Sequence, residues 1–191
     1  AAPCALARAV QLAPPTGVDR PVVAIDLGGA AALMVLAVSG RPAMTRVLRG
    51  CGSNQLSAPL EQGLRLARPD AHQLLRRIGI PSGAAPRAPE GIARATLELL
   101  TAPLARLASE VRRTLSYWQQ VCPGLAPEEL VLFGGGALIR NLPQFLAAEV
   151  GLPTRPWQLS STDASHGPWD DALFGVAAAL SALAWETDAC S

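Results

Sequence analysis

The sequence predicts an α/β fold, in which a mixed sheet is led by an antiparallel meander and flanked by helices. Three short apolar segments joined by tight turns lie between residues 22 and 48, which is typical of a meander. Another short apolar segment lies at Leu130–Phe133, and the long stretches around it carry apolar residues at helical spacing. With 191 residues, half of them apolar, the chain can form one globular domain or at most two small ones.

The expected elements begin with residues 1–20, which we interpret as the end of a preceding helix, Ala1–Gln11, and a connector. Two adjacent prolines and a glycine break that helix. Residues 21–191 are expected to form the main lobe. Its first strands, rich in β-branched and apolar residues, are Val22–Leu27, Ala32–Val38 and Ala43–Leu48, joined by turns at Gly28–Gly29 and Ser39–Pro42.

Two short helices and a linker are expected next. Ser53 is suited to cap a helix that runs to about Leu66, and Pro69 is suited to the first turn of a second helix that ends at Ile78. Gly79–Glu90 contains three prolines and two glycines, so it is expected to be a loop. We therefore treat residues 64–90 as a candidate small inserted subdomain and loop.

The clearest helical periodicity lies in residues 100–118. Pro103 predicts either a kink in this helix or its true first turn. An apolar stripe predicts its buried face, and it consists of Leu100, Leu104, Leu107, Val111, Leu115 and Trp118.

The last elements follow the strand Leu130–Phe133 and three glycines. Hydrophobic spacing and breakers predict a helix at Asn141–Val150, a strand at Thr154–Leu159, a polar loop at Ser160–Pro168 and a final helix from Asp170 to about Glu186.

Composition excludes several classes of function. All 16 basic residues are arginine, so the chain has no P-loop of the GxxxxGK type, no Schiff-base lysine and no lysine general base. The formal net charge is +1, which gives no electrostatic basis for binding a nucleic-acid backbone, so no nucleic-acid partner is expected.

Apolar runs and cysteines predict a soluble, reduced, cytoplasmic chain. The longest uncharged run, Ala172–Trp185, has about 14 residues, short of the ~20 that a transmembrane helix requires. Four separated cysteines without CxxC spacing favour no metal site. Because the chain begins at Ala1 without a methionine, we expect it to be a fragment of a longer protein.

The first candidate site is a carboxylate at the end of a buried strand, followed at once by glycines. Asp26 precedes Gly28 and Gly29 in the segment IDLGG. Glycine lets a backbone approach a phosphate closely, and an adjacent Asp can hold hydrated Mg²⁺. The alternative is that the segment is only a turn.

The second candidate site is a run of three glycines after the strand Leu130–Phe133. Such a run is costly in chain entropy, so the close approach of a ligand is one reason for it. The alternative is steric, in which the following helix packs tightly on the sheet. The residues concerned are Gly134, Gly135, Gly136 and Ala137.

In this order and about a hundred residues apart, the two sites resemble the phosphate-2 and adenosine motifs of the actin, Hsp70 and sugar-kinase superfamily. The segment VVAIDLGGAAALMVLAVSGRPAMTRVLRGCG is similar to the signature of the type IV pilus assembly protein family PilM. So are EVRRTLSYWQQ and ELVLFGGGALIRNLPQFLAAEVGLP, while DALFGVAAAL resembles the closing helix of actin-like folds. The resemblance runs from about Val22 to Leu183 and is to the second lobe of a PilM-like protein.

This resemblance implies an actin-like, ribonuclease H-like ATPase lobe and a nucleotide cleft between two lobes. The glycines after Phe133 would face adenosine and ribose, and Asp26 would face the phosphates and Mg²⁺ through water. ATP and Mg²⁺ are the implied cofactors in the full-length protein, and no catalytic residue is implied. The implied nucleotide-binding residues are Asp26, Gly28, Gly29, Gly134, Gly135, Gly136 and Ala137.

The resemblance also implies partners. Members of the PilM family are cytoplasmic, bind ATP and hold the cytoplasmic tail of the inner-membrane protein PilN; the division protein FtsA is a relative. The implied role is therefore a scaffold for type IV pilus or related secretion-system assembly, peripheral to the inner membrane. A PilN-like tail and other platform proteins are the expected partners, with self-association as a further candidate.

The sequence departs from the family pattern in three ways. Ala30, Ala31 and Ala32 supply no hydroxyl where the superfamily commonly has Thr or Ser. The segment Ala71–Leu75 lacks both charged residues of the family's Ala-Glu-x-x-Lys helix, for which Arg76 or Arg77 is a candidate substitute. The phosphate-1 loop is also absent from this chain, so we expect the fragment to be inactive alone and the full-length protein to be at most a weak ATPase.

The alternative function is that of a sugar- or acetate-kinase-type phosphotransferase of the same superfamily. The missing hydroxyl after Asp26 and the long arginine-rich helix favour the scaffold.

Among the other residues, His166 in the polar loop is expected to be no part of a hydrolase site, and His72 is expected to lie on a helix surface. Trp157 and Trp169 are expected to be buried, with a partner-binding patch as the alternative. The arginine groups, such as Arg112 and Arg113, are expected on solvated faces, offset by acidic residues.

Overall fold

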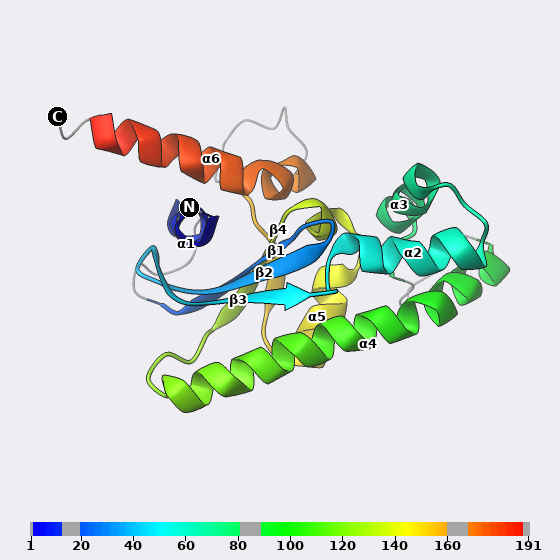
Figure 1. The fold of residues 1–191 in the computed structure, drawn as a ribbon, viewed down its shortest axis with the longest axis horizontal. Coiled ribbons are helices and arrows are strands. Elements are labelled where there is room, and N and C mark those ends of the chain that lie inside the picture. The colour runs from blue at the N-terminus through cyan, green and yellow to red at the C-terminus, as the bar shows by residue number, and fades with distance from the viewer. Residues whose placement is uncertain (1, 13–19, 81–88, 160–167, 189–191) are drawn as a thin grey trace.

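The computed structural model describes residues 2–12, 20–80, 89–159 and 168–188 (Figure 1). The side chains of the last helix are described for residues 171–182 only. The expectations for His166 and Trp169 fall outside these described positions.

A five-stranded sheet lies at the centre of the molecule, with strand order β3-β2-β1-β4-β5. The first three strands form the predicted antiparallel meander, and β4 runs parallel to β1 and to β5. The mixed α/β fold class is therefore confirmed. The strands are β1 Val22–Leu27, β2 Ala31–Val38, β3 Arg41–Arg49, β4 Glu129–Phe133 and β5 Thr154–Pro156.

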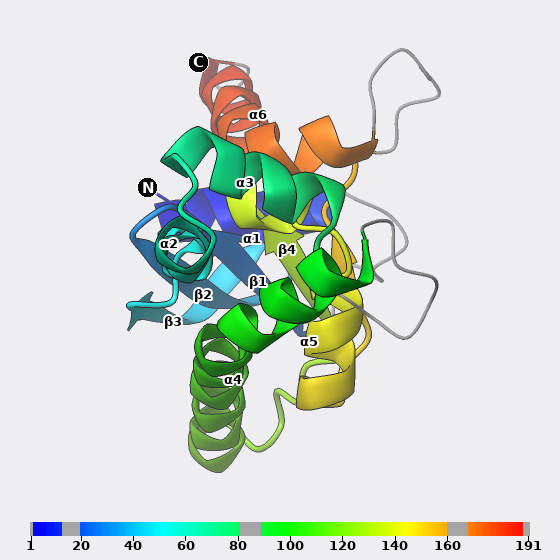
Figure 2. The ribbon, with the colours of Figure 1, turned by 90° about the vertical axis from the view of Figure 1, so that its right-hand side faces the viewer.

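Helices cover both faces of this sheet (Figures 1 and 2). α1 and α6 lie together on one face, and α4 and α5 lie on the other, while α2 and α3 extend from one end of the molecule. The helices are α1 Ala2–Leu12, α2 Ser53–Gly63, α3 Arg68–Arg77, α4 Glu90–Val121, α5 Leu142–Val150 and α6 Pro168–Asp188.

Alternation along β1 creates two hydrophobic cores. Ile25 and Leu27 face the core that contains the α4 stripe, while Val22 and Ala24 face the core under α1 and α6. Both faces of β1 are buried, and Asp26 is its one partly exposed residue, as is typical of a central strand. All six residues of the predicted α4 stripe are buried.

Several boundaries differ from the sequence-based predictions. Ser53 is not an N-cap: Gly52 holds that position, and no side chain caps the helix. Pro103 lies in the interior of α4, which begins at Glu90, so the first-turn prediction was wrong. β5 ends at Pro156 rather than at Leu159. The hairpin between β2 and β3 turns at Ser39 and Gly40, both with positive φ, so the expected turn residue Pro42 belongs to β3.

Trp157 is buried, as expected, and the alternative of a partner-binding patch at this residue was wrong. Its indole N–H donates to the carbonyl of Ala9 at 2.8 Å, and its ring stacks on Phe133. The inserted subdomain at residues 64–90 stays a prediction.

Candidate functional site

The two predicted glycine segments meet at one edge of the sheet. Because β1 and β4 are parallel neighbours, with Asp26 paired to Phe133, their carboxyl ends lie side by side. Such an edge is where ligands bind in open α/β sheets. The structure thus brings Asp26, at the end of β1, next to Gly134, the first residue after β4.

Two features of the structure require glycine at position 134: the backbone conformation there and the closeness of Asp26. Its φ is +77°, a left-handed conformation, and a Cβ at this position would clash with Oδ1 of Asp26. Its N–H donates to the carbonyl of Ala172 at 2.8 Å, which ties the turn to α6. Gly134 therefore allows a carboxylate and a backbone turn to approach closely.

The three glycines of this turn differ in their surroundings. A Cβ on Gly136 would clash with the side chain of Leu27, so Gly136 has a packing role, as the steric alternative expected. A Cβ on Gly135 would meet no heavy atom of the described residues within 4 Å. The sheet therefore does not explain Gly135, whereas it does explain Gly134 and Gly136. Ala137 is fully buried in the core and faces no open space.

Asp26 is a half-buried carboxylate that makes no ion pair with any described residue. Burial raises its pKa above the usual value, and among the described residues no ion pair opposes that effect. A cation beside the carboxylate would restore the interactions that burial removes. The Asp26 carboxylate is thus suited to hold a hydrated Mg²⁺. In the described ranges, no three His, Cys, Asp or Glu residues lie close enough together to form a metal-binding group.

The turn after β1 is occupied on one side by the start of α2. The N–H groups of Ser53 and Asn54 donate to the carbonyl oxygens of Gly28 and Gly29, at 2.8 and 2.9 Å. These two bonds satisfy donors that a helix start leaves unpaired. The carbonyl side of the turn is therefore structural, while Gly29 itself is exposed.

Gly52 belongs to this arrangement and was missed by the sequence analysis. A Cβ on Gly52 would clash with the carbonyl oxygen of Gly29 and the carbonyl carbon of Ala30. Only glycine allows the two chain segments to touch here. The pair Gly50 and Gly52 around Cys51 was a visible signal, because two glycines so close at the end of a strand mark a close backbone approach.

The arginines and His72 named in the sequence analysis lie on the surfaces of helices α3 and α4. Arg76 and Arg77 are exposed on α3, and no contact ties them to Asp26. Arg112 pairs with Glu149 at 2.8 Å, as the expectation of arginines offset by acidic residues predicted. His72 is partly exposed on α3.

No helix within the described ranges combines the length and hydropathy needed to cross a bilayer.

Comparison with solved structures identifies the fold. A chain of a PilM–PilN type IV pilus biogenesis complex is similar to this protein at 21% identity and a TM-score of 0.70. The match covers 94% of this chain and 50% of the chain in that complex. MreB 5 of Spiroplasma citri bound to AMPPNP matches 98% of this chain and 58% of its own, at 16% identity and a TM-score of 0.73.

A third match is the ethanolamine utilization protein EutJ from Carboxydothermus hydrogenoformans, at 16% identity and a TM-score of 0.59, over 92% of this chain and 52% of its own. The chain thus spans about half the length of these structures. No protein-family model and no curated protein sequence matches it. The fold is that of one lobe of an actin-like ATPase, and the predicted resemblance to PilM is confirmed at the level of the fold.

Proposed function

We propose that this chain is the second lobe of a PilM-type scaffold protein and supplies one wall of an ATP site. One observation carries the proposal: the Asp26 carboxylate and the open backbone at Gly135 lie at the carboxyl edge of the parallel pair β1 and β4. The fold similarity to nucleotide-bound MreB 5 and to the protein of the PilM–PilN complex supports it.

Each part of the site has a distinct proposed role. Asp26 would hold Mg²⁺ through water, and bound Mg²⁺ would neutralise charge on the phosphates. The turn at Gly28 and Gly29 would lie against the phosphates, where its N–H groups can donate. The backbone of Gly134 and Gly135 would line adenosine and ribose, with Gly135 as the point of closest approach, while Gly136 and the buried Ala137 would support this turn from within the core.

The proposed role of the whole protein is assembly. A PilN-like tail would bind it and place it beside the inner membrane, at a type IV pilus or related secretion platform. The neighbour in the PilM–PilN complex supports this choice of partner. In the full-length protein, bound nucleotide would serve mainly to regulate the binding of partners, with at most weak ATPase activity.

The test compares Gly135→Ala with Gly124→Ala in the full-length protein that contains this lobe. Neither added methyl meets a heavy atom of the described residues, and neither glycine has a positive φ, so both variants should fold normally. Isothermal titration with ATP and MgCl₂ should show binding weakened roughly tenfold or more by Gly135→Ala, because the methyl fills the ligand's place. Gly124→Ala should bind like wild type, and Asp26→Ala should bind weakly with reduced Mg²⁺ dependence.

Equal ATP affinity in wild type, Gly135→Ala and Asp26→Ala would overturn the assignment of the site. A synthetic PilN-like tail peptide should be retained by the full-length protein in a pull-down. If the peptide were not retained, and Asp26-dependent phosphorylation of a sugar were detected, the kinase alternative would replace the scaffold.

A further inference from the structure

The strand β3 forms an open edge of the sheet. It is nine residues long and stands last in the strand order, paired on one side with β2. In the described part of the chain no strand pairs with its other side. Such an edge offers a row of backbone donors and acceptors to any extended chain that reaches it.

This edge carries basic residues and no acidic ones. β3 has the sequence RPAMTRVLR, and its register with β2 shifts by one residue between Met44 and Pro42. Because of this bulge, Arg41 lies on the same face as Arg46, whereas Arg49 lies on the other face beside Val47, which is 56% exposed. The open backbone is therefore bordered on both faces by positive charge.

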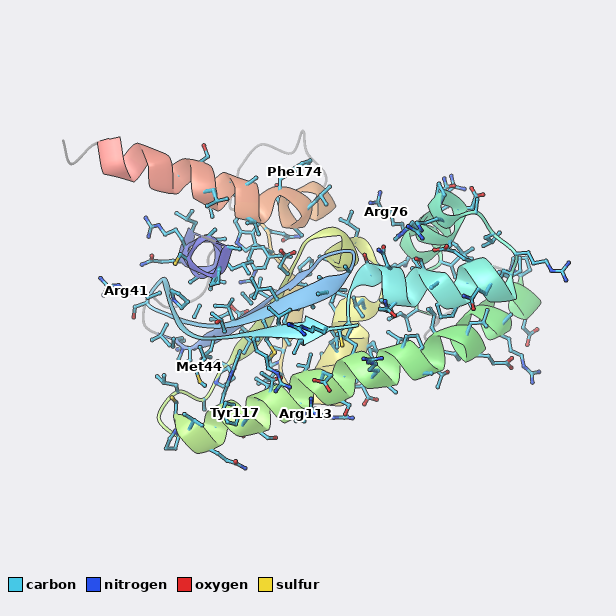
Figure 3. The ribbon with its side chains drawn as sticks, viewed as in Figure 1. Arg41, Met44, Arg76, Arg113, Tyr117 and Phe174 are labelled. Atoms are coloured by element: carbon cyan, nitrogen blue, oxygen red, sulfur yellow. The ribbon has the colours of Figure 1, made fainter. Side chains whose placement is uncertain are left out.

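The helix α4 adds charge beside the same edge. α4 lies along β3, and Figure 3 shows Arg113 and Tyr117 on the part of α4 below Met44. Glu110 is the acid that joins the two elements, pairing with Arg46 at 3.3 Å and with Arg113 at 2.8 Å.

Further along α4, Arg106 reaches the end of β3. A Cβ on Gly50, the residue that follows β3, would lie 2.8 Å from a guanidinium nitrogen of Arg106, which places this cation beside the end of the strand. Tyr117, one turn beyond Arg113, is 51% exposed. We call the combined surface the β3 ledge: Arg41, Arg46, Arg49, Arg106, Arg113 and Tyr117.

Five arginines against one glutamate leave the β3 ledge strongly positive, although the net charge of the whole chain is +1. A positive surface beside an open strand edge selects an extended partner that carries negative side chains. We propose that the β3 ledge binds an acidic peptide segment in extended conformation, which adds a strand to β3 and lays acidic side chains against the arginines.

Two other occupants fit these observations less well. A second copy of the chain would pair β3 with β3, which would bring arginines opposite arginines and is unfavourable. A nucleic acid would use the charges but not the strand edge, because strand addition needs peptide N–H and C=O groups. β2 separates the ledge from β1, although the Arg49 end of the ledge lies at the same edge of the sheet as the proposed ATP site.

The experiment uses a fluorescein-labelled peptide as long as β3, with alternating glutamate and valine, and a matched peptide with lysine in place of glutamate. Fluorescence anisotropy at low ionic strength should show binding of the glutamate peptide alone, weakening with added salt. Hydrogen exchange with bound peptide should slow in those amides of residues 41–49 that face away from β2, because strand addition pairs these otherwise open donors.

The charge-reversal variant Arg41→Glu/Arg49→Glu should bind the peptide roughly tenfold more weakly or worse. Its matched control is Arg76→Glu/Arg77→Glu, which makes the same change of charge at two exposed positions on α3, of which Figure 3 labels Arg76. The control should bind within about twofold of wild type, since α3 is remote from the ledge.

Several results would overturn the proposal. These are no binding of the glutamate peptide at millimolar concentration, equal loss in both charge-reversal variants, or no slowing of exchange in residues 41–49. Tighter binding of a single-stranded oligonucleotide, lost in Arg41→Glu/Arg49→Glu, would make the ledge a nucleic-acid surface instead. Dimers in light scattering that the same variant abolishes would make it a self-association surface.

Discussion

At the scale of single residues, Asp26 is placed at a cost to stability. Its carboxylate is half-buried, and desolvation raises its pKa. Among the described residues no ion pair offsets the cost of burying this carboxylate. Sites that bind a ligand often retain such groups, because the ligand supplies the missing interaction.

Replacing Asp26 with Asn should therefore stabilise the ligand-free protein at pH 7, raising Tm by roughly 2 to 4 °C. The folded-state pKa is raised, so wild type is relatively most stable below the usual value of 3.8 and loses this contribution as pH rises through the folded pKa. The gain from Asp26→Asn should shrink as pH falls towards 3.8. Thermal melts between acid and neutral pH measure it, and a gain that is constant with pH would contradict the explanation.

The sequence predicted much of this site because its residues are distinctive. An Asp before glycines and a run of three glycines each mark a backbone that needs space, and both lie where predicted. Sequence could not assign separate roles to Gly134, Gly135 and Gly136, because those roles depend on Asp26 and Leu27 across the sheet. Ser53 was mistaken for a cap because its cap-like identity is local, whereas the carbonyl of Gly28 that receives its N–H comes from another strand.

At the scale of elements, the start of α2 rests on the turn after β1. Two backbone hydrogen bonds and a glycine contact replace the usual side-chain cap. The position of α2 therefore depends on the absence of a side chain at residue 52.

Gly52→Ala should lower the free energy of unfolding by about 2 kcal/mol or more, since the methyl would clash with backbone atoms that have little room to move. The control is Gly91→Ala in the first turn of α4, where an added Cβ meets nothing within 4 Å. There, helix propensity predicts a gain of up to about 1 kcal/mol. Urea denaturation followed by circular dichroism measures both changes. Equal changes of stability in Gly52→Ala and Gly91→Ala would refute the role of Gly52.

At the scale of the whole molecule, distant parts of the chain are joined around Trp157. Its ring packs on Phe133 in the core that α1 and α6 cover, and its indole N–H donates to the carbonyl of Ala9, 148 residues earlier in the chain. The pairing of β4 with β1 was not foreseen in detail. Short apolar strands carry little information on which neighbour they choose, and only the two buried faces of β1 indicated a central place.

Trp157→Phe keeps most of the ring packing but leaves the Ala9 carbonyl without its donor. We expect a loss of about 1 to 2 kcal/mol in stability, together with faster hydrogen exchange in α1. Mass spectrometry of exchanged peptides, combined with urea denaturation, measures both quantities. Unchanged exchange in α1 would show that this hydrogen bond does not hold the helix.

The attachment of α2 to the turn at Gly28 and Gly29 also has a mechanical consequence. The hydrogen bonds from Ser53 and Asn54 make the turn and the first residues of α2 one body, and α2 packs along α4. A ligand that displaced this turn would therefore be expected to displace the start of α2 as well, unless the packing of α2 on α3 and α4 resisted the movement.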